Sequence, residues 1–182
     1  MKIFQKSLMA SEDVKSLLVS GKYFVDDTAT EIEDGAIVAI GDLIDNVAYT
    51  GRKDHNVRKI AAPAATTDEI GFVDLAEISQ GEIMGNVYKM GYKTAGLTAP
   101  AGIPVRVRKV VDGDMFFLGA DNFDTVPTIG QYAIVEPGMT TLTVTDDISS
   151  YEGIYVKIED IEALTQGTVA SDMIYFCRAH RA

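Results

Sequence analysis

The chain has 182 residues and a formal net charge of −11, with 16 basic against 27 acidic side chains. A chain of this length forms one domain or two small lobes, and it buries roughly 70% of its unfolded surface without a metal or disulfide. The charge repels phosphate backbones and therefore excludes a general nucleic-acid binder.

Cys177 is the only cysteine, so no intrachain disulfide forms, and we expect its thiol to be a small buried hydrophobe. The longest strictly apolar run, Ala36 to Ile40, is far shorter than the ~20 residues of a membrane-spanning helix. The N-terminal residues show no signal-peptide pattern. We therefore expect no membrane contact and synthesis in the cytosol.

The N-terminal region, residues 1–20, is predicted to be an arm followed by a short helix. Ser11 has the chemistry of an N-cap, and Gly21 that of a C-terminal stop. Val14, Leu17 and Leu18 follow the i, i+3, i+4 spacing of one apolar helical stripe. So short a helix is marginal alone, so it must pack on its own domain or on a partner.

Residues 21–182 read as short strands separated by glycine and Asp/Asn turns. Such a pattern predicts a mainly β protein, a β-barrel or β-sandwich, possibly made of two small β lobes. Residues 96–104 hold two prolines and two glycines and are the expected lobe boundary. The expected strands include Tyr23 to Val25, Ala36 to Ile40, Phe72 to Leu75, Asn86 to Tyr92, Tyr132 to Val135, Thr140 to Thr145, Ile154 to Glu159 and Met173 to Arg178.

The clearest local signal lies between Pro104 and Phe123. Alternating Val and Arg residues predict a half-exposed strand, and Asp112-Gly113 predicts a hairpin turn into a second strand, Met115 to Leu118. On this interpretation Arg106 and Arg108 form a solvated face, and reversing both charges leaves folding intact. The alternative is that the two arginines dock an acidic partner.

Candidate chemistry is sparse. Both histidines, His55 and His180, are expected to be exposed bystanders, and no nucleophile, zinc or phosphate-loop motif is present. Acidic pairs such as Asp112 and Asp114 fall where turns are expected, which favours turn chemistry over a loop-bound cation. We therefore predict no catalytic, cofactor-binding or metal-binding residues and a structural or binding role.

From about Tyr23 onward the chain resembles accessory structural proteins that tailed bacteriophages encode beside the major capsid protein. Four stretches and the final strand, Ile174 to Arg178, carry the resemblance: VRVRKVVDGDMFFLGADNF, VPTIGQYA, EIEDGAIVAIG and KIAAPAATTDEIGFVD. The resemblance implies a β-rich capsid decoration protein that binds the outside of a phage head, stabilises the major capsid protein lattice and performs no catalysis.

The same resemblance implies a location on the capsid surface of the virion after synthesis in the host cytoplasm. The expected partners are the major capsid protein and neighbouring copies of the chain, as a trimer or dimer. The candidate contact residues are Val14, Leu17, Leu18, Arg106 and Arg108. One alternative is a tail-tube or head–tail connector subunit, and a less favoured one is a trimeric β-barrel nucleotide hydrolase with Asp112 and Asp114 on Mg²⁺.

Overall fold

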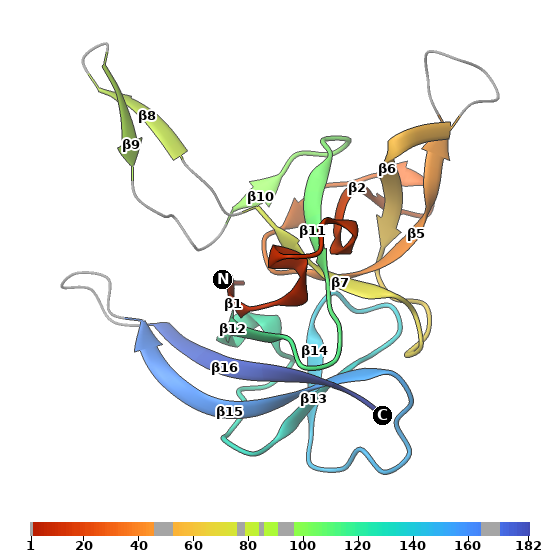
Figure 1. Cartoon of the computed structure of the whole chain (residues 1–182), viewed down its shortest axis with the longest axis vertical. Helices are drawn as coiled ribbons and strands as arrows, with labels where there is room; N and C mark the ends of the chain where they lie inside the picture. Colours follow the sequence, from red (N-terminus) through yellow and green to blue (C-terminus); the bar gives the residue numbers. More distant parts are fainter. Residues whose placement is uncertain (1, 46–52, 76–78, 84–85, 91–96, 165–171) are drawn as a thin grey trace.

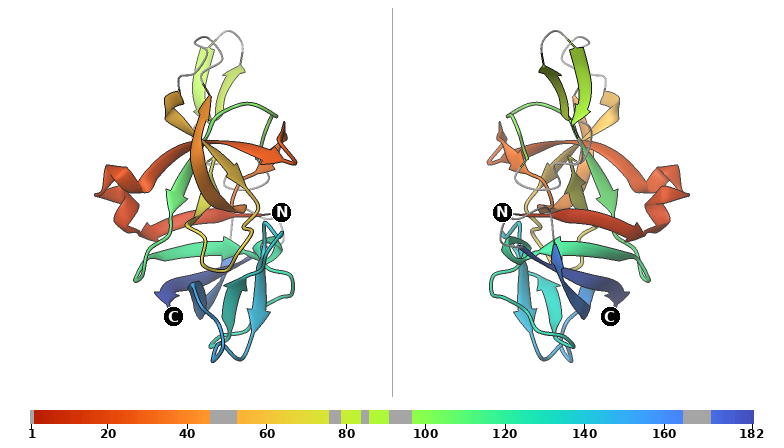
Figure 2. Two further views of the ribbon diagram at one scale, coloured as in Figure 1. Left: turned by 90° about the vertical axis from the view of Figure 1, so that its right-hand side faces the viewer. Right: turned by 90° about the vertical axis from the view of Figure 1, so that its left-hand side faces the viewer.

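A computed structural model of the chain describes residues 2–45, 53–75, 79–83, 86–90, 97–164 and 172–182. The mainly β fold is confirmed, because these residues form several sheets and only three one-turn 3₁₀ segments. No described helix is long and apolar enough to cross a membrane. Two six-stranded sheets form the body, one above the other in Figure 1 and Figure 2.

The first sheet closes on itself. Its order is β11-β7-β5-β6-β2-β3, and β11 pairs with β2 as well, so every strand of the sheet except β3 has at least two hydrogen-bonded neighbours. The pairing of β2 with β6 is parallel and the others are antiparallel. The strands are β2 (Leu18–Val25), β3 (Thr28–Ala29), β5 (Ile37–Asp45), β6 (Lys53–Ala61), β7 (Ile70–Asp74) and β11 (Val105–Lys109). We call it the closed sheet.

The second sheet is an antiparallel sheet in the order β1-β12-β16-β15-β13-β14, which we call the open sheet. It combines the N-terminal strand with the C-terminal third of the chain. Its strands are β1 (Phe4–Leu8), β12 (Met115–Gly119), β13 (Tyr132–Val135), β14 (Leu142–Thr145), β15 (Ile154–Leu164) and β16 (Asp172–Arg181). Two smaller pairs complete the fold: β4 (Ile32–Glu33) with β10 (Thr98–Ala99), and β8 (Ser79–Ile83) with β9 (Asn86–Met90).

Strand alternation divides the apolar side chains between two cores. Val73, Val105 and Val107 belong to one cluster, formed by residues of the closed sheet and the short β4–β10 pair. Phe72, one residue from Val73, points to the opposite face and joins a second cluster with Phe4 and Phe116 of the open sheet. The three phenylalanine rings have centroids 5.0 to 6.0 Å apart. This second core therefore joins the two sheets.

The expected N-terminal helix is wrong. Ala10–Glu12 and Lys15–Leu17 form single 3₁₀ turns, and Leu18 already begins strand β2. Ser11 lies inside the first turn and makes no cap, while Gly21 continues β2 against Ile60, where an added Cβ would lie 2.6 Å from a methyl group. The apolar spacing of Leu17 and Leu18 is equally compatible with a turn that enters a strand. Tertiary pairing with β6 and β11 decides in favour of the strand.

The arm preceding that turn is also part of the body. Phe4 pairs with Leu118 of β12, and Ile3, Phe4 and Met9 are buried. Residues 2–17 therefore run between the two sheets, as the red segment in Figure 1 shows.

The Asp112-Gly113 turn forms, but the hairpin does not. Asp114 donates its N–H to the carbonyl of Val111, and Gly113 has φ +89°, as a tight turn requires. The flanking strands nevertheless separate: β11 pairs with β2 and β7, whereas β12 pairs with β1 and β16. The turn is thus where the chain crosses from the closed sheet to the open one. Of the expected boundary at 96–104, residues 97–104 lead through β10 into β11, and residue 96 is outside the described residues.

Candidate functional site

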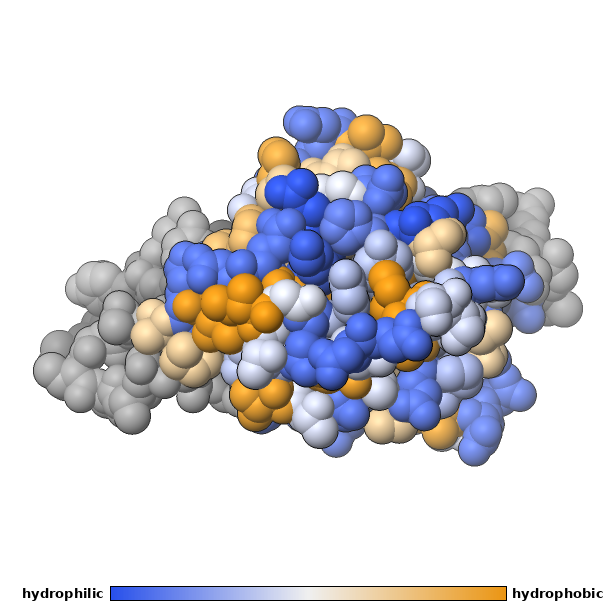
Figure 3. All heavy atoms as spheres, turned by 90° about the horizontal axis from the view of Figure 1, so that it is seen from below, coloured by the Kyte–Doolittle hydropathy of each residue, from blue (hydrophilic) through white to orange (hydrophobic). Residues whose placement is uncertain are grey.

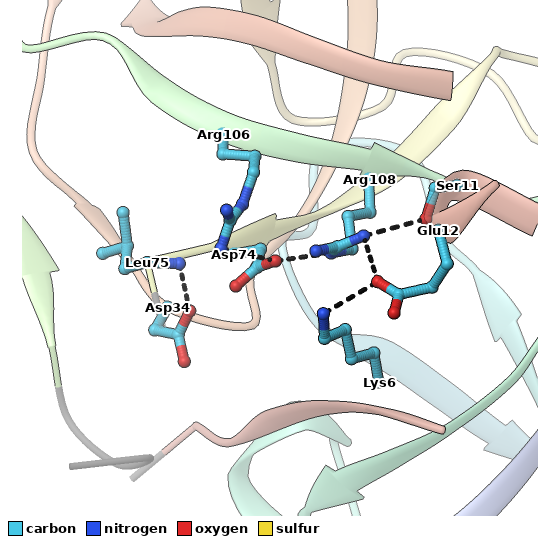
Figure 4. Close-up of polar contacts among 8 residues, drawn as sticks. All are labelled: Lys6, Ser11, Glu12, Asp34, Asp74, Leu75, Arg106 and Arg108. Carbon is cyan, nitrogen blue, oxygen red and sulfur yellow. Dashed lines mark hydrogen bonds and ion pairs between the residues drawn. The ribbon is translucent and has the colours of Figure 1, made fainter. Parts of the chain in front are cut away.

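The densest group of charged side chains in the described residues surrounds Arg108 on β11 (Figure 4). Its Nε lies 2.5 Å from Oδ2 of Asp74 on β7, and its Nη1 lies 3.0 Å from Oε1 of Glu12. Nη1 also donates to the hydroxyl of Ser11, 3.2 Å away. The Arg108 residue is only 3% exposed, so the expectation of a solvated face is wrong for it.

Arg106 takes part in the same cluster from the next outward position on β11. Its Nη2 lies 3.0 Å from Oδ2 of Asp74, so a single buried carboxylate faces two guanidinium groups. The Arg106 side chain is 34% exposed, while the Asp74 side chain is 4% exposed. Reversing both arginine charges would therefore leave Asp74 opposed by two carboxylates. The prediction that folding survives this change assumed that both side chains are exposed; because Arg108 is buried, we now expect the double reversal to disrupt folding.

Strand register explains why these side chains meet. Val105 and Val107 point into the closed sheet, so Arg106 and Arg108 point out of it. Asp74 is the Cα partner of Arg106, and it also points outward because Val73 points in. The N-terminal segment with Ser11 and Glu12 contacts Arg108, which is buried, while Arg106 keeps part of its side chain exposed.

Glu12 connects the buried cluster to the surface. Its Oε1 also accepts a hydrogen bond from Lys6 Nζ on β1, at 2.8 Å. This hydrogen bond, with the charges of Lys6 and Arg108, holds the pKa of Glu12 below its usual range although partial desolvation acts the other way. The chain of contacts therefore runs from β1 of the open sheet to β7 and β11 of the closed sheet.

Asp34 lies beside this cluster and is 1% exposed. Its Oδ1 accepts the N–H of Leu75 at 2.7 Å, but Oδ2 has no hydrogen-bond partner among the described residues. Burial is the largest influence and raises the pKa of Asp34 to about 6, with the negative charge of Asp74 adding to the rise and backbone N–H donors opposing it. Unlike Asp74, this carboxyl is without a described cationic partner.

Two more buried polar side chains fasten the N-terminal segment. Asn122 accepts N–H groups from Ile3 and Gly119 through Oδ1 and donates from Nδ2 to the carbonyl of Gly35. Asp114 accepts the N–H of Ala10 and of Val111, one on each carboxylate oxygen. These bonds satisfy buried backbone donors from three parts of the chain.

The structure brings some of the predicted contact residues together. Leu18 is the Cα partner of Arg108, and Leu17 lines a 370 Å³ pocket with Lys109 and Arg181. Val14 is the most exposed of them, at 47%, whereas Leu17 and Leu18 are half-buried. The residues thus surround the start of β2, where Val14 is exposed, Leu17, Leu18 and Arg106 are partly exposed, and Arg108 is buried.

Other candidate groups are occupied by structural contacts. The carboxylate of Asp112 accepts the N–H of Arg181 at 3.3 Å, and both oxygens of Asp114 are bonded as described above. The described residues contain no group of three or more His, Cys, Asp or Glu side chains able to hold a metal ion. His180 is half-buried with its ring stacked on Tyr155, so its expected exposure is wrong, and the His55 side chain lies outside the described side chains. Cys177 is buried, as predicted.

The sequence had one unused signal for the cluster. Asp74 is the single charged residue of the strand Ile70–Asp74, in which every position is buried, and a buried carboxylate requires a partner. Comparison of the chain with protein-family models, with curated proteins and with solved structures finds no match. The fold and the cluster define a β-rich protein whose two sheets are joined by a buried polar network.

Proposed function

We propose that this chain is a non-enzymatic virion structural protein that binds the outside of a phage head and stabilises the major capsid protein lattice. The resemblance of its strand and turn motifs to phage head accessory proteins suggests the system. The structural observation that supports the proposal is the charged cluster. Arg108 pairs with Asp74 of the closed sheet and with Glu12 of the N-terminal segment, and Glu12 pairs in turn with Lys6 of β1 in the open sheet, so the cluster links the two sheets.

A body of this kind suits a protein that bridges subunits of a shell. Reinforcement requires that force applied to one end of the protein reach the other end, and the core shared by the two sheets provides packed contacts between them. The affinity of such a protein comes from many weak contacts on a repeating lattice, because linked sites raise the effective concentration. The Val14 region and Arg106 are the docking surface of this proposal.

The experiment is reconstitution. Expanded heads that lack the protein are mixed with the purified chain, sedimented, and assayed for bound copies and for resistance to heating. Saturable binding with raised head stability is expected. Absence of co-sedimentation contradicts the proposal, and spontaneous tubes or rings of the purified chain would instead favour the tail-tube or connector alternative.

The docking surface is tested with matched variants. Val14→Asp places a charge on the most exposed candidate and is expected to lower head occupancy. Val126→Asp makes the same change at a residue that is 70% exposed on the loop between β12 and β13, and it serves as the control. Equal occupancy by both variants would remove the Val14 region from the docking surface while leaving the function itself standing.

A further inference from the structure

The open sheet has an outward face that its own core does not use. Its inward residues, such as Phe116, Val156 and Cys177, pack in the core shared with the closed sheet, so the alternate residues point away from the closed sheet. On β12, β16, β15 and β13 these alternate residues are half-buried and contain many aromatic rings. We call the following set the aromatic band: Phe117, Tyr132, Tyr155, Phe176 and His180.

The rings of the aromatic band contact one another across strands. Phe117 and Phe176 have centroids 5.0 Å apart, and Tyr155 lies 5.7 Å from Tyr132 and 5.4 Å from His180. Cross-strand contacts therefore hold the rings in place before any partner arrives. Rigid aromatic side chains lose little conformational entropy on binding, which is one reason that they are enriched in protein interfaces.

The charges between the rings are few and of both signs. Arg178 Nε lies 3.0 Å from Glu159 Oε1, and Arg178 Nη2 also contacts the sulfur of Met115 at 3.9 Å. Lys157 lies two residues from Glu159 on the same face of β15 and forms no ion pair with a described residue. Asp160, the Cα partner of Phe176, adds an exposed carboxylate to the same face, so two basic groups stand beside two acidic ones on a chain whose net charge is −11.

This charge pattern indicates which partner the aromatic band fits. Two copies of a strongly acidic chain repel one another over most of their surfaces, and repulsion is smallest where each presents a nearly neutral, apolar face. A twofold axis between two β15 strands would bring Lys157 of each copy towards Glu159 of the other, so the face is complementary to itself. Isologous twofold contacts are also the commonest form of association between identical chains.

We propose that the aromatic band is the interface of a twofold homodimer of this chain. Figure 3 views the molecule from the side of β15 and β16, where hydrophobic residues stand in groups among hydrophilic ones. The proposal names the surface by which copies associate and does not depend on head binding, because it concerns the purified chain alone. A protein that failed to bind heads could still form this dimer, and the reverse holds too.

The test is the mass of the purified chain in solution over a concentration series, by light scattering and sedimentation equilibrium. The wild type is expected at twice the mass of one 19.7 kDa chain. Phe176→Ser with Tyr155→Ser is expected to weaken association by about 30-fold or more, as for buried aromatic anchors of an interface. Phe24→Ser is the matched control, because Phe24 is a half-buried aromatic residue of β2 in the closed sheet.

A second variant guards against loss of folding. Lys157→Glu removes no ring and adds a carboxylate to those of Glu159 and Asp160, so it is expected to weaken the dimer, more strongly at low salt than at high salt. Circular dichroism verifies that each variant is folded. A monomeric wild type at every concentration overturns the proposal, as does a trimer, because a twofold contact closes at two copies. Dimers that persist unchanged in folded aromatic and Lys157 variants overturn it as well.

Discussion

Arg108 and Asp74 form an ion pair in which both side chains are 4% exposed, with Nε and Oδ2 2.5 Å apart. Arg106 lies on the same carboxylate and Glu12 on the same guanidinium. The pair therefore holds β7 and β11 together and attaches the N-terminal segment to them. Its energetic value lies less in the attraction itself than in the cost of leaving either charge buried alone.

Replacement of Arg108 by Met is therefore expected to destabilise the protein by about 3 kcal/mol, because Asp74 keeps only the partly exposed Arg106 and the contacts of Arg108 with Glu12 and Ser11 are lost. Urea unfolding followed by circular dichroism measures the loss. Arg106→Met is the control, since Arg106 is one-third exposed and Asp74 would keep Arg108. If the two variants lost nearly equal free energies of unfolding, the buried Arg108–Asp74 pair would contribute no more to stability than the partly exposed Arg106.

The sequence predicted the alternation of β11 but not its surroundings. The strand has two valines, Val105 and Val107, on one face and two arginines on the other. This pattern is expected for a strand with one solvent-exposed face. A strand whose second face is covered by a polar segment gives the same pattern. Only the fold of residues 2–17 over that side distinguishes the two. This contact depends on pairing of β1 with β12, more than a hundred residues away in sequence, which no local spacing encodes.

The same reasoning applies to the turn and the helix. Asp112-Gly113 fixes a turn because its backbone conformation is local, but the choice of partner for each flanking strand is made by distant residues. Val14, Leu17 and Leu18 fit a helical stripe, yet pairing of β2 with β6 and β11 decided their conformation. Of the candidate site, the sequence therefore identified Arg106 and Arg108. It assigned Ser11 to a helix cap and missed the Asp74 carboxylate between the two arginines.

Asp34 is expected to make stability depend on pH. Its folded pKa is about 6, above the value of about 3.9 in an unfolded chain, so the folded state binds the proton more tightly. The stabilisation is fully present below about pH 4 and is lost as the pH rises through 6, a difference of about 3 kcal/mol. Groups such as Glu12, with a lowered pKa, act in the opposite sense and lose their contribution as the pH falls.

Asp34→Asn isolates this effect. Asparagine keeps an oxygen for the N–H of Leu75 and has no charge to bury, so the variant should be more stable than the wild type at about pH 8 and similar at about pH 4. Urea unfolding at both pH values gives the comparison. A variant that is less stable at the higher pH would mean that the ionised carboxylate is stabilised in the fold.

The N-terminal segment is expected to be essential for folding, whether or not it also docks. Phe4 is 2% exposed and its ring stacks on Phe72 with centroids 5.1 Å apart. Phe4→Ala should therefore cost about 3 to 5 kcal/mol, whereas Gln5→Ala, at the next and exposed position of β1, should change stability by less than about 0.5 kcal/mol. Thermal unfolding measures both. A folded Phe4→Ala variant as stable as the wild type would show that residues 2–8 are an arm that the fold does not need.

Cys177 provides a test of whether the two sheets unfold together. The thiol is fully buried in the open sheet, its sulfur contacts the carbonyl of Tyr175, and burial raises its pKa, so a thiol reagent should react only after the sheet opens. Arg108 belongs to the closed sheet, but Phe72 and Ile37 of that sheet pack in the same core as Cys177. We therefore expect Arg108→Met to raise the rate of Cys177 labelling by the factor that corresponds to its loss of global stability, under conditions in which reclosing is faster than labelling. A labelling rate that stays at the wild-type value while the closed sheet is destabilised would show instead that the open sheet unfolds as a unit of its own.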